Sequence, residues 1–453
     1  MKIFDTMSGQ KRPFTPLNAE RVGLYLCGIT VYDHCHIGHA RVMVAFDVIT
    51  RYLRASGYNL NYVRNITDVD DKIFARAAER GLPFNELTEH FIQAMHEDLE
   101  RLGCAAPDQE PRATGHMADI IALIQRLQTE GAAYQGVGGD VYFRVSAYAD
   151  YGKLNNRKLD EMLAGARVEV AGDKESPADF VLWKSAKPGE HAWPSPWGEG
   201  RPGWHIECSA MSMKCLGESF DIHGGGPDLK FPHHENEIAQ SEAATHKPYA
   251  GTWMHAGAVR VDNEKMSKSL GNFFTIREVL ERYDAELVRW FLLGTHYRAH
   301  INYSDQALDA AAESLTRIYR ALRSAPSVGE PCPDLVARFH ALMDDDFNVP
   351  GVVALIHEGC KRINTGDDAA AARGFLGYAG DVLGVFQQDP DTFSAVVQQG
   401  SGLDDSAVQA LVDGRAQAKR DRDFAEADRI RAALAEAGIE IEDTREGTRW
   451  SRR

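Results

Sequence analysis

Two short stretches of the sequence carry side chains that could bind phosphate groups. His36 and His39 lie three residues apart in the first, and Lys265 and Lys268 lie three residues apart in the second. Imidazole and ammonium groups donate hydrogen bonds to phosphate oxygens, and chemistry at phosphorus needs such fixed donors more than a nucleophile from the protein. We therefore predict that these four residues act as catalytic groups. The alternative is that both pairs are ordinary solvated side chains, which would be the default for an isolated pair of lysines but is disfavoured when both stretches occur together.

Local patterns indicate which elements position these residues. Alternating apolar residues at Val22–Leu26 predict a strand, and apolar residues at helical spacing predict a helix from Ile37 to about Gly57. The two histidines are therefore expected at a helix N-terminus, where free backbone N–H groups and the helix dipole favour phosphate. The serines and the glycine around the two lysines favour a mobile loop.

Length and cysteine usage limit the class of protein. The chain has 453 residues, enough for two to four domains. Its seven cysteines are odd in number and widely scattered, which argues against a disulfide framework and for a reducing compartment. No apolar run is long enough to span a membrane, and the first residues do not resemble a signal peptide. We expect a soluble cytoplasmic protein.

The formal net charge of −16 argues against a surface that binds nucleic acid over its whole area. Any RNA contact must then come from local basic patches. One candidate is Arg415, Lys419, Arg420 and Arg422, whose spacing gathers them on one side of a helix. A solvated helix that also carries acidic residues explains the same spacing, and the sequence does not decide between the two.

The order of the patterns predicts a mixed α/β protein whose first domain is interrupted. The three consecutive glycines at 224–226 are not followed by the Gly-Lys-Ser/Thr of a Walker motif. Their sequence therefore disfavours a P-loop ATPase. The predicted domains are a nucleotide-binding catalytic domain, first half (1–110), an inserted subdomain (111–202), the second catalytic half with the lysine stretch (203–304), a helical bundle (305–398) and a C-terminal domain (399–453). Further predicted elements are a strand at Leu60–Val63, helices at Asp119–Leu127, Ala310–Leu322, Leu335–Met343 and Val352–Ile363, a strand at Val141–Val145, and two helices followed by strands within 405–453.

Four residues of metal-binding type occur at separate places in the chain. His233 and Glu237 are four apart, so one helical face would present both, while Cys27 and Cys208 could add thiolates. Spacing alone is weak support, because a buried cysteine is more often a small hydrophobic residue. The same helix could also use His234.

The motifs taken together resemble the bacterial cysteinyl-tRNA synthetases, a family of class I aminoacyl-tRNA synthetases. The resemblance runs over essentially the whole chain and rests on the two phosphate-binding stretches, residues 25–32, 64–72 and 221–226, the histidine-rich helix, and residues 447–450. It implies a Rossmann-like class I catalytic domain with an inserted subdomain, followed by a helical bundle and a small anticodon-binding domain.

The resemblance also implies roles for individual residues. Cys27, Cys208, His233 and Glu237 would bind one Zn²⁺ per chain. The other implied binding residues are Thr67, Trp204 and His223 around the amino acid, and Lys268 is assigned to the nucleotide. Gly224, Gly225 and Gly226 have no side chains, so the backbone could approach the nucleotide closely there, although a plain turn would also explain them. A metal–sulfur bond could separate cysteine from serine, a difference that an apolar pocket barely senses. Four protein ligands would close a tetrahedral site, so a purely structural zinc stays open. If the sulfur atom of the substrate cysteine binds the ion, either the ion becomes five-coordinate or the bond between Glu237 and the ion must weaken.

The implied activity is ATP-dependent ligation of L-cysteine to tRNA(Cys) through cysteinyl-adenylate, with Mg²⁺ accompanying ATP and the chain acting as a monomer. Two alternatives remain at this point. Related ligases join cysteine to an amino-sugar, but they lack a full anticodon-binding end. The second alternative is a relative that binds RNA but has lost catalysis. Both phosphate-binding stretches and all four metal-binding residues are intact, which disfavours this alternative.

Overall fold

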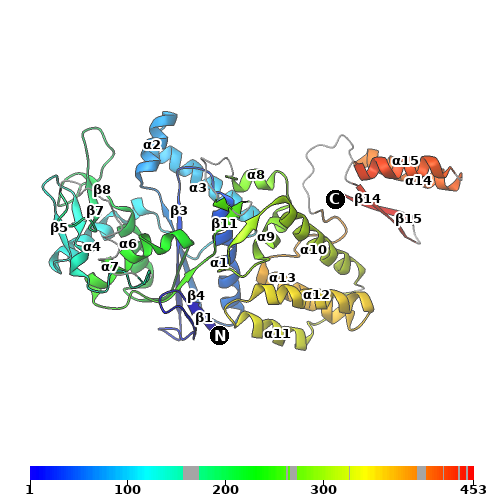
Figure 1. The fold of residues 1–453 in the computed structure, drawn as a ribbon, viewed down its shortest axis with the longest axis horizontal. Helices are drawn as coiled ribbons and strands as arrows, with labels where there is room; N and C mark the ends of the chain where they lie inside the picture. Colours follow the sequence, from blue (N-terminus) through cyan, green and yellow to red (C-terminus); the bar gives the residue numbers. More distant parts are fainter. Residues whose placement is uncertain are drawn as a thin grey trace. The chain divides into compact units, whose positions relative to one another are not determined.

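The computed structural model forms two compact units and describes residues 1–156, 173–261, 264–265, 273–325, 327–394, 405–421, 423–436, 439–444 and 447–452 (Figure 1). Unit 1 comprises Met1–Val259, Thr295–Ile301 and His340–Val349. Unit 2 comprises Arg260–Gly294, Asn302–Phe339 and Pro350–Arg453. No helix among the described residues has the length and apolar character needed to cross a membrane.

A four-stranded parallel sheet forms the centre of unit 1. Its strands lie in the order β10 (Ala250–His255), β9 (Phe220–Gly225), β3 (Val22–Thr30) and β4 (Leu60–Thr67). The two central strands are almost entirely buried, as expected of a parallel sheet covered on both faces. Because β3 pairs with β9, segments from both predicted halves of the catalytic domain share one sheet.

The connections of this sheet create a topological switch point between its two central strands. Helix α1 (Ile37–Ala55) leads from β3 to β4, and helix α7 (His233–Thr245) lies between β9 and β10 in the chain. The chain therefore leaves the centre of the sheet in opposite directions. Ligands of open α/β sheets bind at such a switch point, outside the carboxyl ends of the strands.

Helix α6 (Trp204–Leu216) packs against α7 and lies beside β3 and β4. The remaining elements of unit 1 include the hairpin β1 (Lys2–Asp5) and β2 (Gln10–Pro13), the helices α2 (Asp71–Arg80), α3 (Phe84–Arg101) and α4 (Met117–Thr129), and the antiparallel sheet β5 (Ala133–Gln135), β6 (Val141–Phe143), β7 (Phe180–Ser185) and β8 (Gly200–Pro202). That small sheet lies within the segment predicted to be an insertion, and the predicted strand at Val141–Val145 ends earlier, at Phe143.

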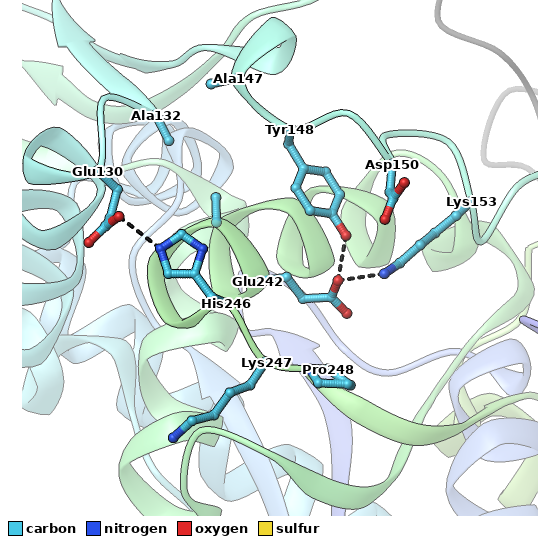
Figure 2. A pocket seen from close by; sticks show the side chains of 11 residues that line it. Glu130, Ala132, Ala147, Tyr148, Asp150, Lys153, Glu242, His246, Lys247 and Pro248 are labelled. Atoms are coloured by element: carbon cyan, nitrogen blue, oxygen red, sulfur yellow. Dashed lines mark hydrogen bonds and ion pairs between the residues drawn. The ribbon is translucent and has the colours of Figure 1, made fainter.

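A cavity of about 510 Å³ lies between the inserted segment and the end of α7 (Figure 2). Four of its ionisable side chains form two pairs. Glu242 accepts hydrogen bonds from the Tyr148 hydroxyl and from Lys153 Nζ, and His246 Nε2 lies 2.8 Å from Glu130 Oε2. The cavity contains none of the predicted site residues.

Unit 2 is mainly helical. Its elements include α8 (Ile276–Leu280), α9 (Ala285–Leu293), α10 (Asp305–Ser324), α12 (Val349–Thr365) and α13 (Ala369–Leu383), and the neighbouring elements at its borders are β11 (Val259–Val261), β12 (Glu264–Lys265), β13 (Ile301–Tyr303) and α11 (Pro333–Met343). The three helices predicted between residues 310 and 363 are confirmed, each with a few more residues than the apolar pattern indicated.

A small substructure ends the chain. Helix α14 (Asp405–Arg420) packs against α15 (Phe424–Glu436), and β14 (Ile439–Thr444) pairs with β15 (Gly447–Arg452). The core contains Val408, Val412, Ile430, Leu434 and Ile439. The prediction of two helices followed by strands is confirmed.

The candidate basic face in this region is wrong in one member. Arg415 is only 5% exposed, because it lies on the packed side of α14. Lys419 and Arg420 are exposed, and Arg422 lies outside the described residues.

Candidate active site and metal centre

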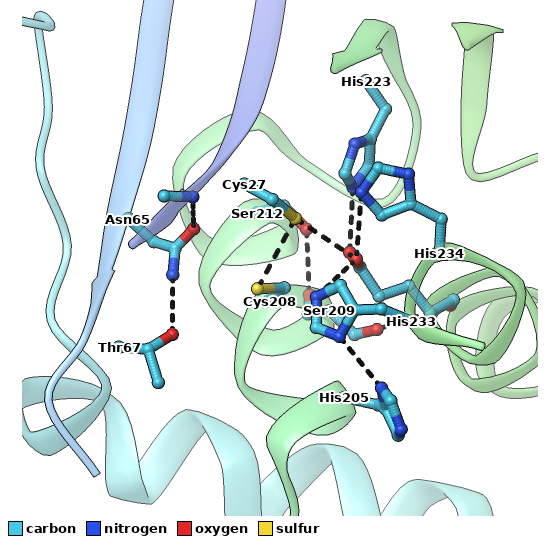
Figure 3. Close-up of polar contacts among 12 residues, drawn as sticks. Cys27, Asn65, Thr67, His205, Cys208, Ser209, Ser212, His223, His233 and His234 are labelled. Atoms are coloured by element: carbon cyan, nitrogen blue, oxygen red, sulfur yellow. Dashed lines mark hydrogen bonds and ion pairs between the residues drawn. The ribbon is translucent and has the colours of Figure 1, made fainter. Parts of the chain in front are cut away.

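Three elements at the carboxyl ends of the central strands bring the four predicted metal-binding residues together (Figure 3). Cys27 Sγ, near the end of β3, lies 3.8 Å from Cys208 Sγ in α6 and 3.4 Å from Glu237 Oε1 in α7. His233 Nε2, one turn before Glu237, lies 3.1 Å from the same carboxylate oxygen. All four side chains are buried, so water cannot satisfy them.

A second group of donor atoms overlaps with the first. It contains Cys27, His223, His234 and Glu237. His234 Nδ1 lies 2.9 Å from His255 Nε2, while His234 Nε2 is buried and has no hydrogen-bond partner among the described residues. The sequence left His234 open as an alternative to His233, and the geometry places each imidazole in one of the two donor groups. Only the group with His233 includes both cysteines.

The charge states of this cluster suit a soft divalent cation. A hydrogen bond from the Cys27 thiol lowers the pKa of Cys208 to about 6, whereas burial raises the pKa of Cys27. Burial alone would raise the pKa of Glu237, but His223 and His233 hold it well below its ordinary value. A thiolate and a carboxylate thus lie together in a dry site. Two sulfurs, an imidazole and a carboxylate are ligand types that Zn²⁺ prefers.

Neighbouring side chains fix the orientation of two of these groups. Glu237 Oε2 lies 2.9 Å from His223 Nε2 and accepts a hydrogen bond of 3.1 Å from the Tyr249 hydroxyl, so Oε1 is left to face Cys27 and His233. His233 Nδ1 lies 2.9 Å from His205 Nδ1. Such outer contacts set the ring orientation and the tautomer of metal-binding histidines.

The three residues expected around an amino acid lie close to this cluster. Trp204 begins α6 and stacks on His233, with ring centroids 4.3 Å apart. Thr67 ends β4 and accepts a hydrogen bond of 3.3 Å from Asn65 Nδ2. His223 is fully buried, and its Nε2 atom faces Glu237. His223 therefore contacts a potential metal ligand directly, a contact that the sequence did not indicate.

Gly28 holds the ends of β3 and β4 together. Its N–H donates to Asn65 Oδ1 at 2.9 Å, and a Cβ atom at this position would lie 1.6 Å from the Asn65 carbonyl oxygen. Any side chain here would push the two strands apart. Glycine at this position thus allows the close approach that positions Cys27 and Thr67.

The two signature histidines lie at the start of α1, as predicted. His36 is the N-cap, and its Nδ1 accepts from the N–H groups of Gly38 and His39, while His39 Nδ1 accepts from the His36 N–H. Because each Nδ1 accepts, the proton of each neutral ring is assigned to Nε2. Burial and the nearby His36 lower the pKa of His39. His39 is thus a neutral N–H donor. Any positive charge that acts on a bound phosphate must come from other residues or from a metal ion.

The lysine stretch is described only in part. Lys265 belongs to β12, whose register pairs it with Arg260 in β11, so this residue lies in a short strand and not in the expected loop. Lys268 lies outside the described residues.

The glycine run after His223 has a packing role that the sequence did not reveal. A Cβ atom on Gly224 would lie 2.3 Å from the Phe46 ring of α1, and one on Gly225 would lie 2.7 Å from the His234 ring of α7. These two glycines let both helices pack onto the end of β9. A Cβ atom on Gly226 would lie 2.7 Å from the Asp228 carboxylate and 3.8 Å from the Val42 side chain.

Comparison with known proteins gives the family. Residues 13–313 match the model of the tRNA synthetases class I (C) catalytic domain, and residues 338–387 match the DALR domain. The chain is 58% identical to cysteine–tRNA ligase of Chromohalobacter salexigens over 459 residues, which cover 99% of both chains. It is 56% identical to that of Hahella chejuensis, with full coverage of both.

A solved structure supports the fold. Mycobacterium tuberculosis methionyl-tRNA synthetase in complex with methionyl-adenylate matches with a TM-score of 0.60 at 18% identity, covering 80% of this chain and 89% of that one. At this level of identity the likeness concerns the architecture alone. Because the similarity to cysteine–tRNA ligases extends over the full length at more than half identity, the chain belongs to the cysteine–tRNA ligase family of class I aminoacyl-tRNA synthetases.

Proposed function

We propose that this protein ligates L-cysteine to its cognate tRNA in two steps driven by ATP. In the first, the carboxylate of cysteine attacks the α-phosphate of ATP, and pyrophosphate leaves as cysteinyl-adenylate forms. In the second, a terminal ribose hydroxyl of the tRNA attacks the acyl carbon, and AMP leaves. The full-length identity to cysteine–tRNA ligases carries this proposal.

The histidines and lysines supply the hydrogen-bond donors for the first step. Negative charge develops on the departing pyrophosphate, and preorganised donors lower the barrier by stabilising it. His36 and His39 would act as neutral N–H donors, in keeping with the lowered pKa of His39. Lys265 and Lys268 would supply the positive charge, together with the Mg²⁺ that accompanies ATP.

The buried donor cluster would hold one Zn²⁺ per chain, through Cys27, Cys208, His233 and Glu237. When bound, the ion would select the substrate by its affinity for a thiolate, which serine lacks. The group with His233 is favoured over the one with His234 because it brings two cysteine sulfurs to the ion.

The rest of the proposed substrate site follows from the motifs. Thr67, Trp204 and His223 would line the amino-acid pocket, and Gly224, Gly225 and Gly226 would lie along the nucleotide. The relevant contacts are the stacking of Trp204 on His233 and the burial of Thr67 and His223 beside the donor cluster.

RNA binding requires local positive charge in a chain of net charge −16. A cavity of about 440 Å³ in unit 2 meets this requirement: Arg317 and Arg320 of α10 and Lys361 of α12 line it, and the described residues around it include no carboxylate. We propose that this cationic groove contacts tRNA phosphates. Arg338 and Arg362 instead form ion pairs with Glu358.

The remaining assignments are finer proposals. The five domains would follow the predicted boundaries, with the bundle at 305–398 and the anticodon-binding domain at 399–453. The matched DALR domain at 338–387 lies within the proposed bundle. The protein would act as a cytoplasmic monomer.

Exchange of labelled pyrophosphate into ATP tests the proposal when it is measured with cysteine, with serine and without an amino acid. We expect exchange with cysteine only, and charging of tRNA(Cys) when it is added. Exchange without charging would favour the amino-sugar ligase, and tRNA binding without exchange would favour the silent relative. Either result would overturn the proposal.

A further inference from the structure

A buried carboxylate beside the metal centre has no cationic partner among the described residues, and the neighbour that favours its charge is the Thr67 side chain. Glu207 lies in the first turns of α6, directly before Cys208, and is fully inaccessible to solvent. Neither of its carboxylate oxygens completes a hydrogen bond with a described residue. An unsatisfied buried carboxylate is costly for a fold, so the position calls for a group that pairs with it.

The groups around Glu207 do not supply this partner. Those that act on its charge are Cys208, Asp68 and Asp70, which all oppose ionisation, and Thr67, which favours it. The surroundings thus hold negative charge, and the missing partner is a cation.

Other acidic residues in this region differ from Glu207 because each accepts hydrogen bonds from donors within the fold. Asp68 accepts from the N–H and the hydroxyl of Thr114. Asp70 caps α2 by accepting from the Lys72 N–H. Glu235, which is equally buried, accepts from the N–H groups of Gly152 and Asn155. Glu207 therefore stands apart from the acids that serve the fold.

The position of Glu207 matches the geometry of a cysteine molecule. It adjoins Cys208 in α6 and lies near Thr67 at the end of β4. The thiol and the ammonium group of cysteine sit on adjacent carbon atoms. With the thiol at the donor cluster, the ammonium group falls next to it, and the carboxylate stays available for attack on ATP.

We propose that Glu207 receives the α-ammonium group of the cysteine substrate through a charge-assisted hydrogen bond. This inference rests on the proposed function, since it assumes that cysteine binds at the donor cluster. It assigns a separate recognition group to each part of the substrate: the donor cluster to the thiol, Glu207 to the ammonium group, and neither to the reacting carboxylate.

The experiment compares thiols that differ in one group. Isothermal titration of the zinc-loaded protein measures the affinity of cysteine, of cysteamine, which lacks the carboxylate, and of 3-mercaptopropionate, which lacks the ammonium group. Glu207→Gln should weaken cysteine and cysteamine by about 10- to 100-fold, the usual range for a lost charge-assisted hydrogen bond. Binding of 3-mercaptopropionate and the zinc content should not change.

Glu218→Gln is the control, because it removes a carboxylate that is paired with Arg126 and Lys247 outside the site. It should leave all three affinities unchanged. If Glu207→Gln does not fold, Glu207→Asp is the second variant. It keeps the negative charge but holds the carboxylate on a shorter side chain, farther from the ligand, so it should weaken the binding of cysteine and cysteamine and not that of 3-mercaptopropionate.

Equal weakening of all three thiols, or no weakening of any, would overturn the role of Glu207 and assign it to packing. These titrations need no turnover, so they can fail while cysteine-dependent pyrophosphate exchange in the unmodified protein succeeds. In that case the proposed function would stand without this inference.

Discussion

Replacing Cys208 by serine changes one donor atom of the proposed metal centre from sulfur to oxygen. A neutral hydroxyl is a much weaker ligand for Zn²⁺ than a thiolate. We expect Cys208→Ser to lower zinc content below about one ion per chain, the stoichiometry of a single closed site. The KM for cysteine should rise more than that for ATP, as measured by elemental analysis and pyrophosphate exchange.

The same helix offers the control for this substitution. Cys215 lies in α6 but does not belong to either donor group, so Cys215→Ser should keep both zinc and activity. Full zinc content together with normal cysteine use in the Cys208 variant would contradict the selectivity mechanism.

Lys268 is expected to act on the transition state. Its ammonium group would meet developing charge chiefly as pyrophosphate departs, so Lys268→Ala should slow adenylate formation by orders of magnitude. Cysteine affinity should hardly change. Single-turnover formation of the adenylate checks this, and a rate close to that of the unmodified protein would assign the lysine to the solvated surface.

Sequence reasoning found the donor atoms of the site but not the residues that support them. Cys27, Cys208, His233 and Glu237 were identifiable by type, spacing and motif. His205, Glu207 and Tyr249 were not, although the first two stand within three residues of Cys208. Their roles depend on contacts that exist only once α6, α7 and β10 have packed, and no spacing along the chain encodes such contacts.

At the scale of elements, the end of α13 contains a glycine that the fold requires. Gly384 has a φ of +68°, and a Cβ atom there would lie 2.6 Å from Arg289 Nη2. Arg289 is buried and donates to the Leu383 carbonyl, which connects α9 to this helix end. Gly384→Ala should therefore destabilise the protein by about 1–3 kcal/mol, from the left-handed backbone and the crowding.

Gly377 provides the control within the same helix. It lies in the interior of α13, and a Cβ atom there would meet nothing within 4 Å. Gly377→Ala should be neutral or stabilising by up to about 1 kcal/mol, from helix propensity. Denaturant unfolding of both variants measures the difference, and equal destabilisation would refute the argument.

Most elements could be predicted from the sequence, while their edges and packing could not. The apolar period located α1, α10 and α12, but α10 begins and ends at polar residues that carry no period, and α12 ends at one. The basic face predicted on α14 is wrong for one residue because helical spacing places residues on one side without saying which side packs. Arg415 is on the packed side.

At the scale of the whole molecule, the C-terminal substructure should be separable from the first step. Every residue assigned to activation precedes Leu270, and residues 405–452 contain a small apolar core of their own. Truncation after Gln399 should therefore spare pyrophosphate exchange and strongly reduce tRNA charging. Full charging by the truncated protein would contradict the assignment of 399–453 to anticodon recognition.

The cationic groove of unit 2 gives a second test of tRNA binding that leaves the chain length unchanged. Arg317 and Lys361 are exposed and come from different helices, so their substitution removes charge without disturbing either core. Arg317→Ala combined with Lys361→Ala should weaken tRNA binding. It should also reduce the slope of log K against log salt by about 0.9 for each phosphate that the variant no longer neutralises.

Arg338→Ala is the control for this variant. It also removes an exposed arginine from unit 2, but one paired with Glu358 at 2.8 Å and absent from the groove. Its tRNA affinity and salt slope should match those of the unmodified protein, and both variants should keep cysteine-dependent exchange. If the two variants lose tRNA affinity equally, the loss reflects net charge and not a phosphate-binding groove. If neither variant loses tRNA affinity, the tRNA contacts of this acidic chain lie outside the cavity between α10 and α12.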